Sequence, residues 1–155
     1  MSDWVRSTRD CTLEGLPGDI VTAIHKHVEL YNLGLRPSQV SDCIETTSKK
    51  SKAGLFERGN REVVTGVLLS PGWLLWAIRA DRPDVTVMSA RLADITVQDY
   101  AATPFAKMVA DSGVEITGCF TAVTERGSSF IGLDDSPAAQ HFKQQLMGAV
   151  QAARK

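Results

Sequence analysis

The sequence contains few cysteines and no long apolar stretch, and both absences narrow the classes of protein to consider. Its three cysteines, Cys11, Cys43 and Cys119, are widely spaced and form no CxxC pair, so the sequence predicts neither a disulfide framework nor a zinc site. No apolar stretch approaches the ~20 residues that a bilayer crossing needs. The amino terminus, MSDWVRSTRDC, lacks the apolar core of a signal peptide, so we expect a cytoplasmic protein.

Motifs for catalysis and cofactor binding are also absent. The sequence has no GxSxG or SxxK nucleophile motif and no GxxxxGK[ST] or GxGxxG phosphate loop. His25 and Glu29 lie four apart in a predicted helix, but two ligands without a third do not predict a metal site. Seventeen Lys and Arg against eighteen Asp and Glu give a net charge of -1, which provides no general basic field for nucleic acid. We therefore expect no enzyme, no cofactor, no metal and no nucleic-acid partner.

Two amphipathic helices are predicted near the ends of the chain. Residues 17–34 carry an apolar stripe at spacings of three and four, and Gly34 followed by Pro37 ends the pattern. The second helix begins at Pro137 after an N-cap candidate, Ser136, and its apolar stripe continues to the end of the chain. The sixteen residues before the first helix are polar and aperiodic, so we expect no regular element there.

About seven short strands are expected between these helices. Residues 63–69 and 73–78 are apolar runs separated only by Ser70-Pro71-Gly72, whose turn chemistry predicts an antiparallel hairpin. Residues 40–50 alternate weakly and predict a strand at a solvent-exposed edge of the sheet. The other expected elements are strands within 85–88, 92–97, 114–121 and 129–133, and a short helix over 104–111.

The short strands and tight turns predict the fold class. Such strands must be mostly antiparallel, because parallel pairs need long crossover connections. We therefore expect an α+β fold, in which a curved antiparallel seven-stranded sheet or partly open β-barrel is capped by the carboxy-terminal helix and carries an added amino-terminal helix. Trp73 and Trp76 should point to opposite faces of their strand. One belongs in the core, and the other is either exposed at an interface or covered by the 17–34 helix. We favour the second of these alternatives.

The order of elements resembles a known superfold. A basic loop, the LLSPGWLLW hairpin, the SARLADITV strand pair, two further strands and the DDSPAAQHFKQQL helix resemble the pleckstrin-homology-like (PH-like) superfold, above all small bacterial PH-like and GRAM-type domains. The resemblance implies an amino-terminal segment over 1–39, with its helix, and a PH-like domain over 40–155. Eukaryotic PH domains generally carry a Trp in the closing helix. Here Phe142 is the only aromatic there, which argues against a phosphoinositide-reading domain.

Positive charge gathers in one segment. Residues 49–61 (KKSKAGLFERGNR) hold five basic residues against Glu57 alone, a local charge of +4. The resemblance implies that this loop binds phosphate groups and that loops 79–84 and 125–128 flank it. Lys and Arg suit phosphate because they donate several charge-assisted hydrogen bonds. A loop that is merely solvated is the more common reading of such a run. The candidate anion or acidic-partner site comprises Lys49, Lys50, Lys52, Arg58, Arg61, Arg79, Arg82 and Arg126.

Three functional hypotheses follow. The first is a non-enzymatic PH-like binding or adaptor module that recognises a protein partner, associates with itself, or binds weakly to an anionic membrane surface. The second is a helix-grip domain with an internal small-molecule cavity, which serves as a ligand carrier or small enzyme and needs roughly 300 Å³ of space. The third is a structural subunit of a larger assembly, with the 17–34 helix as its docking arm.

Overall fold

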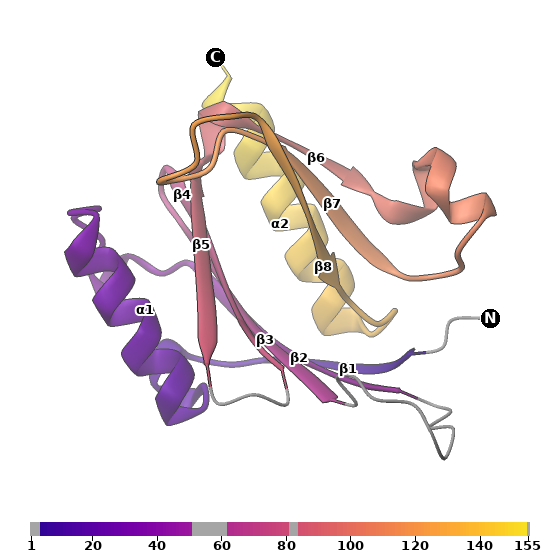
Figure 1. Cartoon of the computed structure of the whole chain (residues 1–155), viewed down its shortest axis with the longest axis horizontal. Coiled ribbons are helices and arrows are strands. Elements are labelled where there is room, and N and C mark those ends of the chain that lie inside the picture. The colour runs from indigo at the N-terminus through magenta and orange to yellow at the C-terminus, as the bar shows by residue number, and fades with distance from the viewer. Residues whose placement is uncertain (1–3, 51–61, 81–83, 155) are drawn as a thin grey trace.

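The computed structural model describes residues 4–50, 62–80 and 84–154, and these residues form an α+β fold. Their strands make two antiparallel sheets, one in the order β1-β2-β3-β4-β5 and one in the order β6-β7-β8 (Figure 1). The strands are β1 (Trp4–Asp10), β2 (Asp42–Lys50), β3 (Glu62–Ser70), β4 (Trp73–Arg79), β5 (Val85–Arg91), β6 (Ile95–Asp99), β7 (Gly113–Gly118) and β8 (Gly127–Gly132), and the α-helices are α1 (Gly18–Leu30) and α2 (Pro137–Ala153). Within the described ranges the sheets do not join into a closed barrel.

Strand β1 corrects the expectation that the chain before the first helix is irregular. It pairs antiparallel with β2 along its whole length and forms an edge of the five-stranded sheet. Consequently β2 is an internal strand, not the edge strand that its weak alternation suggested. The inward-facing side chains of β1 include Arg6 and Thr8, which are satisfied by hydrogen bonds rather than by apolar contacts. A strand with polar inward positions shows no hydrophobic alternation, and for this reason the pattern missed it.

The β3–β4 hairpin confirms the turn prediction. Ser70 pairs with Trp73, and the two strands continue antiparallel from that point. Gly72 has a φ of +85°, the positive value that suits glycine at the third position of a type II turn. Most residues of both strands are buried because the five-stranded sheet is covered on both faces.

The helix α2 is the element that local sequence signals specify best. It begins at Pro137 after Ser136, whose Oγ accepts a hydrogen bond from the backbone N–H of Ala139, and it ends at Ala153 as predicted. Its apolar stripe packs against β1, β2 and β6, so α2 lies along the space between the two sheets (Figure 1). Phe142, on that stripe, is fully buried in the main core.

The main core fills the space between the two sheets and α2. Trp76 is fully buried there, with its ring edge-on to Phe120 at 5.3 Å between centroids. Its Nε1 donates a hydrogen bond to Ser129 Oγ at 3.0 Å, which satisfies the one polar atom of the indole. Side chains from both sheets and from α2 meet in this cluster, so the sheet interior is occupied by the protein itself.

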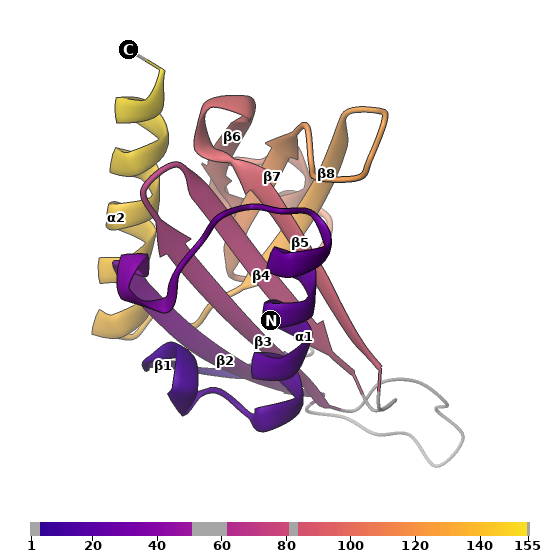
Figure 2. The same cartoon turned by 90° about the vertical axis from the view of Figure 1, so that its left-hand side faces the viewer.

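Helix α1 covers the outer face of the five-stranded sheet (Figure 2). Its fully buried Ile20 and Ile24 pack with residues of β3 and β4, and Trp73 is half-buried against this second cluster, as favoured from the sequence. The helix ends before the expected residue 34, because Asn32 already adopts a positive φ of 50°.

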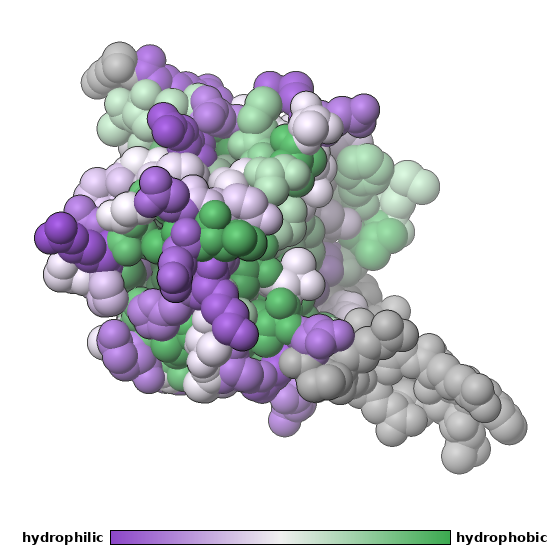
Figure 3. Space-filling model, turned by 60° about the vertical axis from the view of Figure 1, so that its left-hand side comes forward, coloured by the Kyte–Doolittle hydropathy of each residue, from purple (hydrophilic) through white to green (hydrophobic). Residues whose placement is uncertain are grey.

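On the side of the molecule that α1 covers, hydrophilic and hydrophobic residues are mixed over the surface (Figure 3). Among the described residues, no helix has the length and apolarity to cross a membrane.

Candidate functional site

The structure describes half of the basic residues in the predicted anion site. Lys52, Arg58, Arg61 and Arg82 lie outside the described residues. Lys49 and Lys50 occupy the end of β2, and Arg79 occupies the end of β4. The register places Lys49 opposite Glu62, two residues before Val64, which is the residue opposite Arg79. Lys49, Lys50 and Arg79 therefore lie at one end of the five-stranded sheet.

Arg126 lies at a different end of the molecule. It precedes Gly127, which pairs with Gly118 on β7, and Gly118 in turn pairs with Ile95 at the start of β6. Arg126 lines a pocket of about 250 Å³ there together with Arg154 near the end of α2. Strand β6 starts close to where β5 ends, at the end of the sheet opposite to that of the other described basic residues. The structure therefore does not bring Arg126 together with them.

Two of the described basic residues already lie beside acidic side chains. The Arg79 guanidinium donates to both carboxylate oxygens of Asp19 on α1, at 2.7 and 3.0 Å. This hydrogen bond is the main reason why the pKa of Asp19 is lowered, and its exposed position keeps the energetic value of the pair small. Lys49 Nζ lies 3.9 Å from a carboxylate oxygen of Glu62. Arg79 therefore ties α1 to the sheet, and its charge is not available to a ligand in full.

A second candidate site is the connection between β6 and β7, which we call the projection (residues 100–112). It extends away from both sheets (Figure 1). Its Phe105, Met108 and Val109 side chains are 60%, 83% and 63% exposed, unusual values for three apolar residues within five positions. The sequence predicted a helix over 104–111 that ends before Gly113, but only Pro104–Lys107 forms a helical turn, of the 3-10 type.

Hydrogen bonds give the projection a fixed shape. The Tyr100 hydroxyl lies 2.6 Å from the carbonyl oxygen of Val109 and 3.3 Å from that of Phe105, so it links both sides of the projection. Thr103 is buried, and its Oγ1 donates to the carbonyl oxygen of Tyr100 at 2.7 Å. The Tyr100 ring also packs on Phe130 of β8, with 5.2 Å between centroids. The exposed apolar residues thus sit on an ordered support.

An ion pair fastens the base of the projection to the five-stranded sheet. Arg6 Nη2 on β1 lies 2.8 Å from each carboxylate oxygen of Asp111, and Arg6 Nε donates to the same carboxylate. The Arg6 and Asp111 side chains are only 10% and 15% exposed. The guanidinium also donates to Ser48 and lies over the Phe130 ring at 5.5 Å. One side chain therefore joins β1, β2, β8 and the projection.

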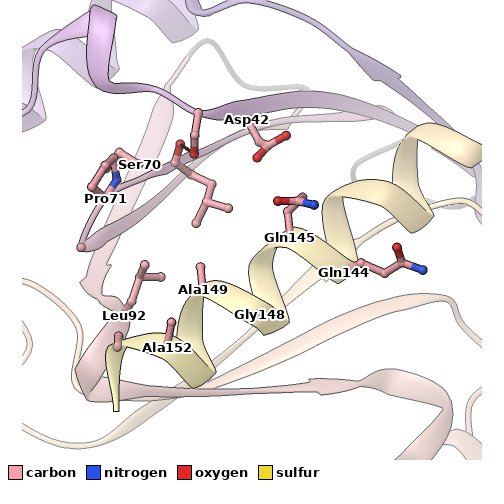
Figure 4. Close-up of a pocket in the computed structure, with 13 residues that line it drawn as sticks. Asp42, Ser70, Pro71, Leu92, Gln144, Gln145, Gly148, Ala149 and Ala152 are labelled. Carbon is pink, nitrogen blue, oxygen red and sulfur yellow. Dashed lines mark hydrogen bonds between the residues drawn. The ribbon is translucent and has the colours of Figure 1, made fainter. Parts of the chain in front are cut away.

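A third feature is an open groove that runs along α2. It holds about 640 Å³ and lies between α2, the start of β2 and the β3–β4 turn. Asp42 points into it from β2 and Gln145 from α2, while Leu92 and Ala149 provide apolar walls (Figure 4). Burial raises the pKa of Asp42, partly opposed by the charge of His141. This groove is open to solvent and separate from the filled core, so it is not the enclosed cavity of a helix-grip domain.

A chain of polar side chains links α1 to β5 and to the connection between β7 and β8. His27 Nε2 lies 2.7 Å from Ser89 Oγ on β5, and Ser89 Oγ donates to Thr121 Oγ1 at 2.7 Å. Because the single hydroxyl proton of Ser89 goes to Thr121, His27 donates from Nε2. Ser89 is fully buried, so no substrate reaches its hydroxyl, and this serine–histidine contact acts as a structural tie.

The same contact predicts a pH dependence of stability. Burial lowers the pKa of His27, so the unfolded chain takes up a proton at a higher pH than the folded chain does. The free energy of unfolding should therefore fall as the pH drops from about 7 through the unfolded value of about 6.5 towards the folded one. Urea unfolding of the wild type and of His27→Gln at several pH values checks this. The variant should lose less stability on acidification, and equal losses would contradict the prediction.

Comparisons with known proteins give no family. No family model, no curated protein and no solved structure matches the chain. In the described residues no group of three His, Cys, Asp or Glu side chains is arranged to hold a metal ion. Function must therefore be argued from this chain's own surface, on which the projection is the feature that sequence reasoning missed. A run such as PFAKMVA resembles a buried helix in sequence, and only its tertiary position exposes it.

Proposed function

We propose that this chain is a non-enzymatic binding module on a PH-like plan, which recognises a protein partner through the projection. The observation that carries the proposal is the exposure of Phe105, Met108 and Val109 on an ordered support. The proposed location is the cytoplasm, where reducing conditions keep neighbouring thiols such as Cys11 and Cys43 reduced.

The order of the strands supports a PH-like plan. Strands β2 to β5 are consecutive neighbours in one sheet, β6 to β8 form a second sheet, and α2 follows directly to close the space between them. The order of elements, short strands followed by a closing helix, is the feature of residues 40–155 on which the resemblance rests. On this view β1 and α1 are additions that widen the first sheet and cover its outer face.

The composition of the projection favours a protein partner. Aromatic and Met side chains are enriched at protein interfaces, and a few such residues supply most of the binding energy. An ordered loop also loses less conformational entropy on binding than a flexible one. Lys107 is exposed between the apolar residues, so a matching partner presents an apolar pocket for Phe105 with an acidic group beside it.

An anionic membrane surface is the less favoured target. Among the described basic residues of the predicted site, Arg79 is held by Asp19, Lys49 lies close to Glu62, and Arg126 lies elsewhere. A helix-grip function is also less favoured, because Trp76 and Phe142 occupy the space that a ligand would need.

Substitution of the apolar residues tests this proposal. We expect a variant with Phe105→Ser, Met108→Ser and Val109→Ser to keep its fold, because the three side chains are exposed. It should lose a specific protein that co-purifies with the tagged wild type, and it should bind that purified protein about 100-fold more weakly. The matched control is Leu30→Ser with Tyr31→Ser, two exposed apolar residues at the end of α1, which should retain the partner.

Two results would overturn the proposal. One is an identical set of bound proteins for the wild type and the triple variant. The other is binding to vesicles of phosphatidylcholine and phosphatidylserine that the triple variant loses and the control keeps, because this result assigns the projection to a lipid surface. Circular dichroism and thermal unfolding verify that both variants are folded.

A further inference from the structure

Two cysteines that are far apart in the sequence lie side by side in the structure. Cys11 directly follows β1 and Cys43 is the second residue of β2. Because Asp10 pairs with Ile44, Cys11 comes opposite Cys43, and its backbone N–H donates to the Cys43 carbonyl oxygen at 3.1 Å. The two Sγ atoms are 3.1 Å apart. Opposed residues of an antiparallel pair have Cα atoms about 4.5–5.5 Å apart, a separation that disulfides also span.

The two thiols differ in access and in acidity. Cys43 is buried, whereas Cys11 is half-buried at the end of its strand. A hydrogen bond with the Cys43 thiol lowers the pKa of Cys11 and the charge of Arg9 lowers it further, while burial opposes both. The same contact, together with burial, raises the pKa of Cys43. Cys11 is therefore the more accessible and the more acidic of the two thiols, with Cys43 behind it, the arrangement of an attacking and a resolving cysteine.

We propose that Cys11 and Cys43 form a reversible dithiol–disulfide site that hydroperoxides oxidise. The Cys11 thiolate attacks one peroxide oxygen of hydrogen peroxide, the O–O bond breaks, and the departing hydroxide takes a proton to leave as water. The Cys43 sulfur then attacks the resulting sulfenic acid, the S–O bond breaks, and the hydroxide takes the Cys43 proton as a second water. Two electrons pass from the sulfurs to the peroxide, and a dithiol reductant reverses the reaction.

Oxidation at this position changes how the amino-terminal part of the chain is held. The bond would join residues 32 positions apart and close a loop that contains all of α1. It would also fasten the edge strand β1 to β2, the strand that pairs with it in the described part of the sheet. Closing a loop of this length in the unfolded chain should raise the midpoint of thermal unfolding by about 10 °C.

Intact-mass analysis of the purified wild type tests the proposal without any substitution. The reduced protein is treated with hydrogen peroxide, alkylated with N-ethylmaleimide and digested. We expect a loss of two hydrogen masses, alkylation of Cys119 alone, and a peptide that links Cys11 to Cys43. Dithiothreitol should restore three alkylated cysteines, and the unfolding midpoint should follow the redox state.

Variants assign the two roles. Cys43→Ser should accumulate a sulfenic acid on Cys11 that dimedone traps, whereas Cys11→Ser should leave Cys43 reduced at the same peroxide concentration. Cys119→Ser is the matched control, and it should oxidise like the wild type because this cysteine is exposed and remote in the fold. The proposal fails if Cys11 and Cys43 are both alkylated after peroxide treatment of the wild type, or if Cys119 alone is oxidised.

Discussion

Replacing Phe142 by alanine is expected to lower the free energy of unfolding by about 4 kcal/mol. The side chain is 1% exposed, and it lies on the stripe of α2 that packs into the space between the two sheets. Removing the ring loses its apolar burial and leaves a cavity that two sheets and a helix cannot easily close. A loss of this size is a large fraction of the free energy of unfolding of a typical domain, which is roughly 5–15 kcal/mol.

Urea unfolding followed by tryptophan fluorescence measures this loss. Gln144→Ala, an exposed position on the same helix, is the matched control and should change the free energy of unfolding by less than about 0.5 kcal/mol. If Phe142→Ala is no more destabilising than this control, α2 does not close the core as described.

Replacing Arg6 by alanine should lower the free energy of unfolding by about 3 kcal/mol. The substitution removes the guanidinium from the Asp111 carboxylate, whose side chain is only 15% exposed. It also removes the cation that lies over the Phe130 ring. Because Asp111 closes the base of the projection, hydrogen exchange within residues 104–112 should become faster as well.

A double-mutant cycle isolates the ion pair. Arg6→Ala, Asp111→Ala and the double variant should give a coupling energy of at least about 1 kcal/mol, because the two groups interact directly. The matched control is Lys49→Ala on the neighbouring strand β2. Lys49 also lies near an acidic residue, Glu62, but their side chains are 69% and 47% exposed, so this loss should stay below about 1 kcal/mol. Equal losses at Arg6 and Lys49 would contradict the role given to Arg6.

The elements that local chemistry specifies were predictable from the sequence. The bounds of α2 follow from Ser136 and Pro137 at its start, and the β3–β4 hairpin follows from Pro71 and Gly72 in its turn. Both signals act between residues that are close in the chain. The α+β class followed from the same kind of reasoning.

The features that depend on distant contacts were not predictable. Strand β1 was missed because Arg6 and Thr8, which face inward, are polar and draw their stability from partners such as Asp111, 105 residues away. The division of the strands into two sheets also depends on tertiary packing. For the same reason the neighbouring cysteines were read as widely spaced, since only the pairing of β1 with β2 brings Cys11 to Cys43.

The candidate site shows the same limit. The sequence directed attention to the basic loops, because charge is visible in a sequence, and the structure places Lys49, Lys50 and Arg79 at one end of a sheet. Exposure is not visible in a sequence. Phe105, Met108 and Val109 could therefore be identified as a docking surface only after their surroundings were known.

Photo-crosslinking from single positions in living cells tests the proposed docking surface most directly. A benzophenone amino acid at position 108 on the projection should give one discrete protein adduct on illumination, and the adduct should disappear when Phe105 and Val109 are changed to serine. The same group at position 123, an exposed apolar residue in the β7–β8 connection, should give no such adduct. An adduct that forms equally well from both positions, or from position 123 alone, would contradict the assignment of the projection as the partner-binding surface.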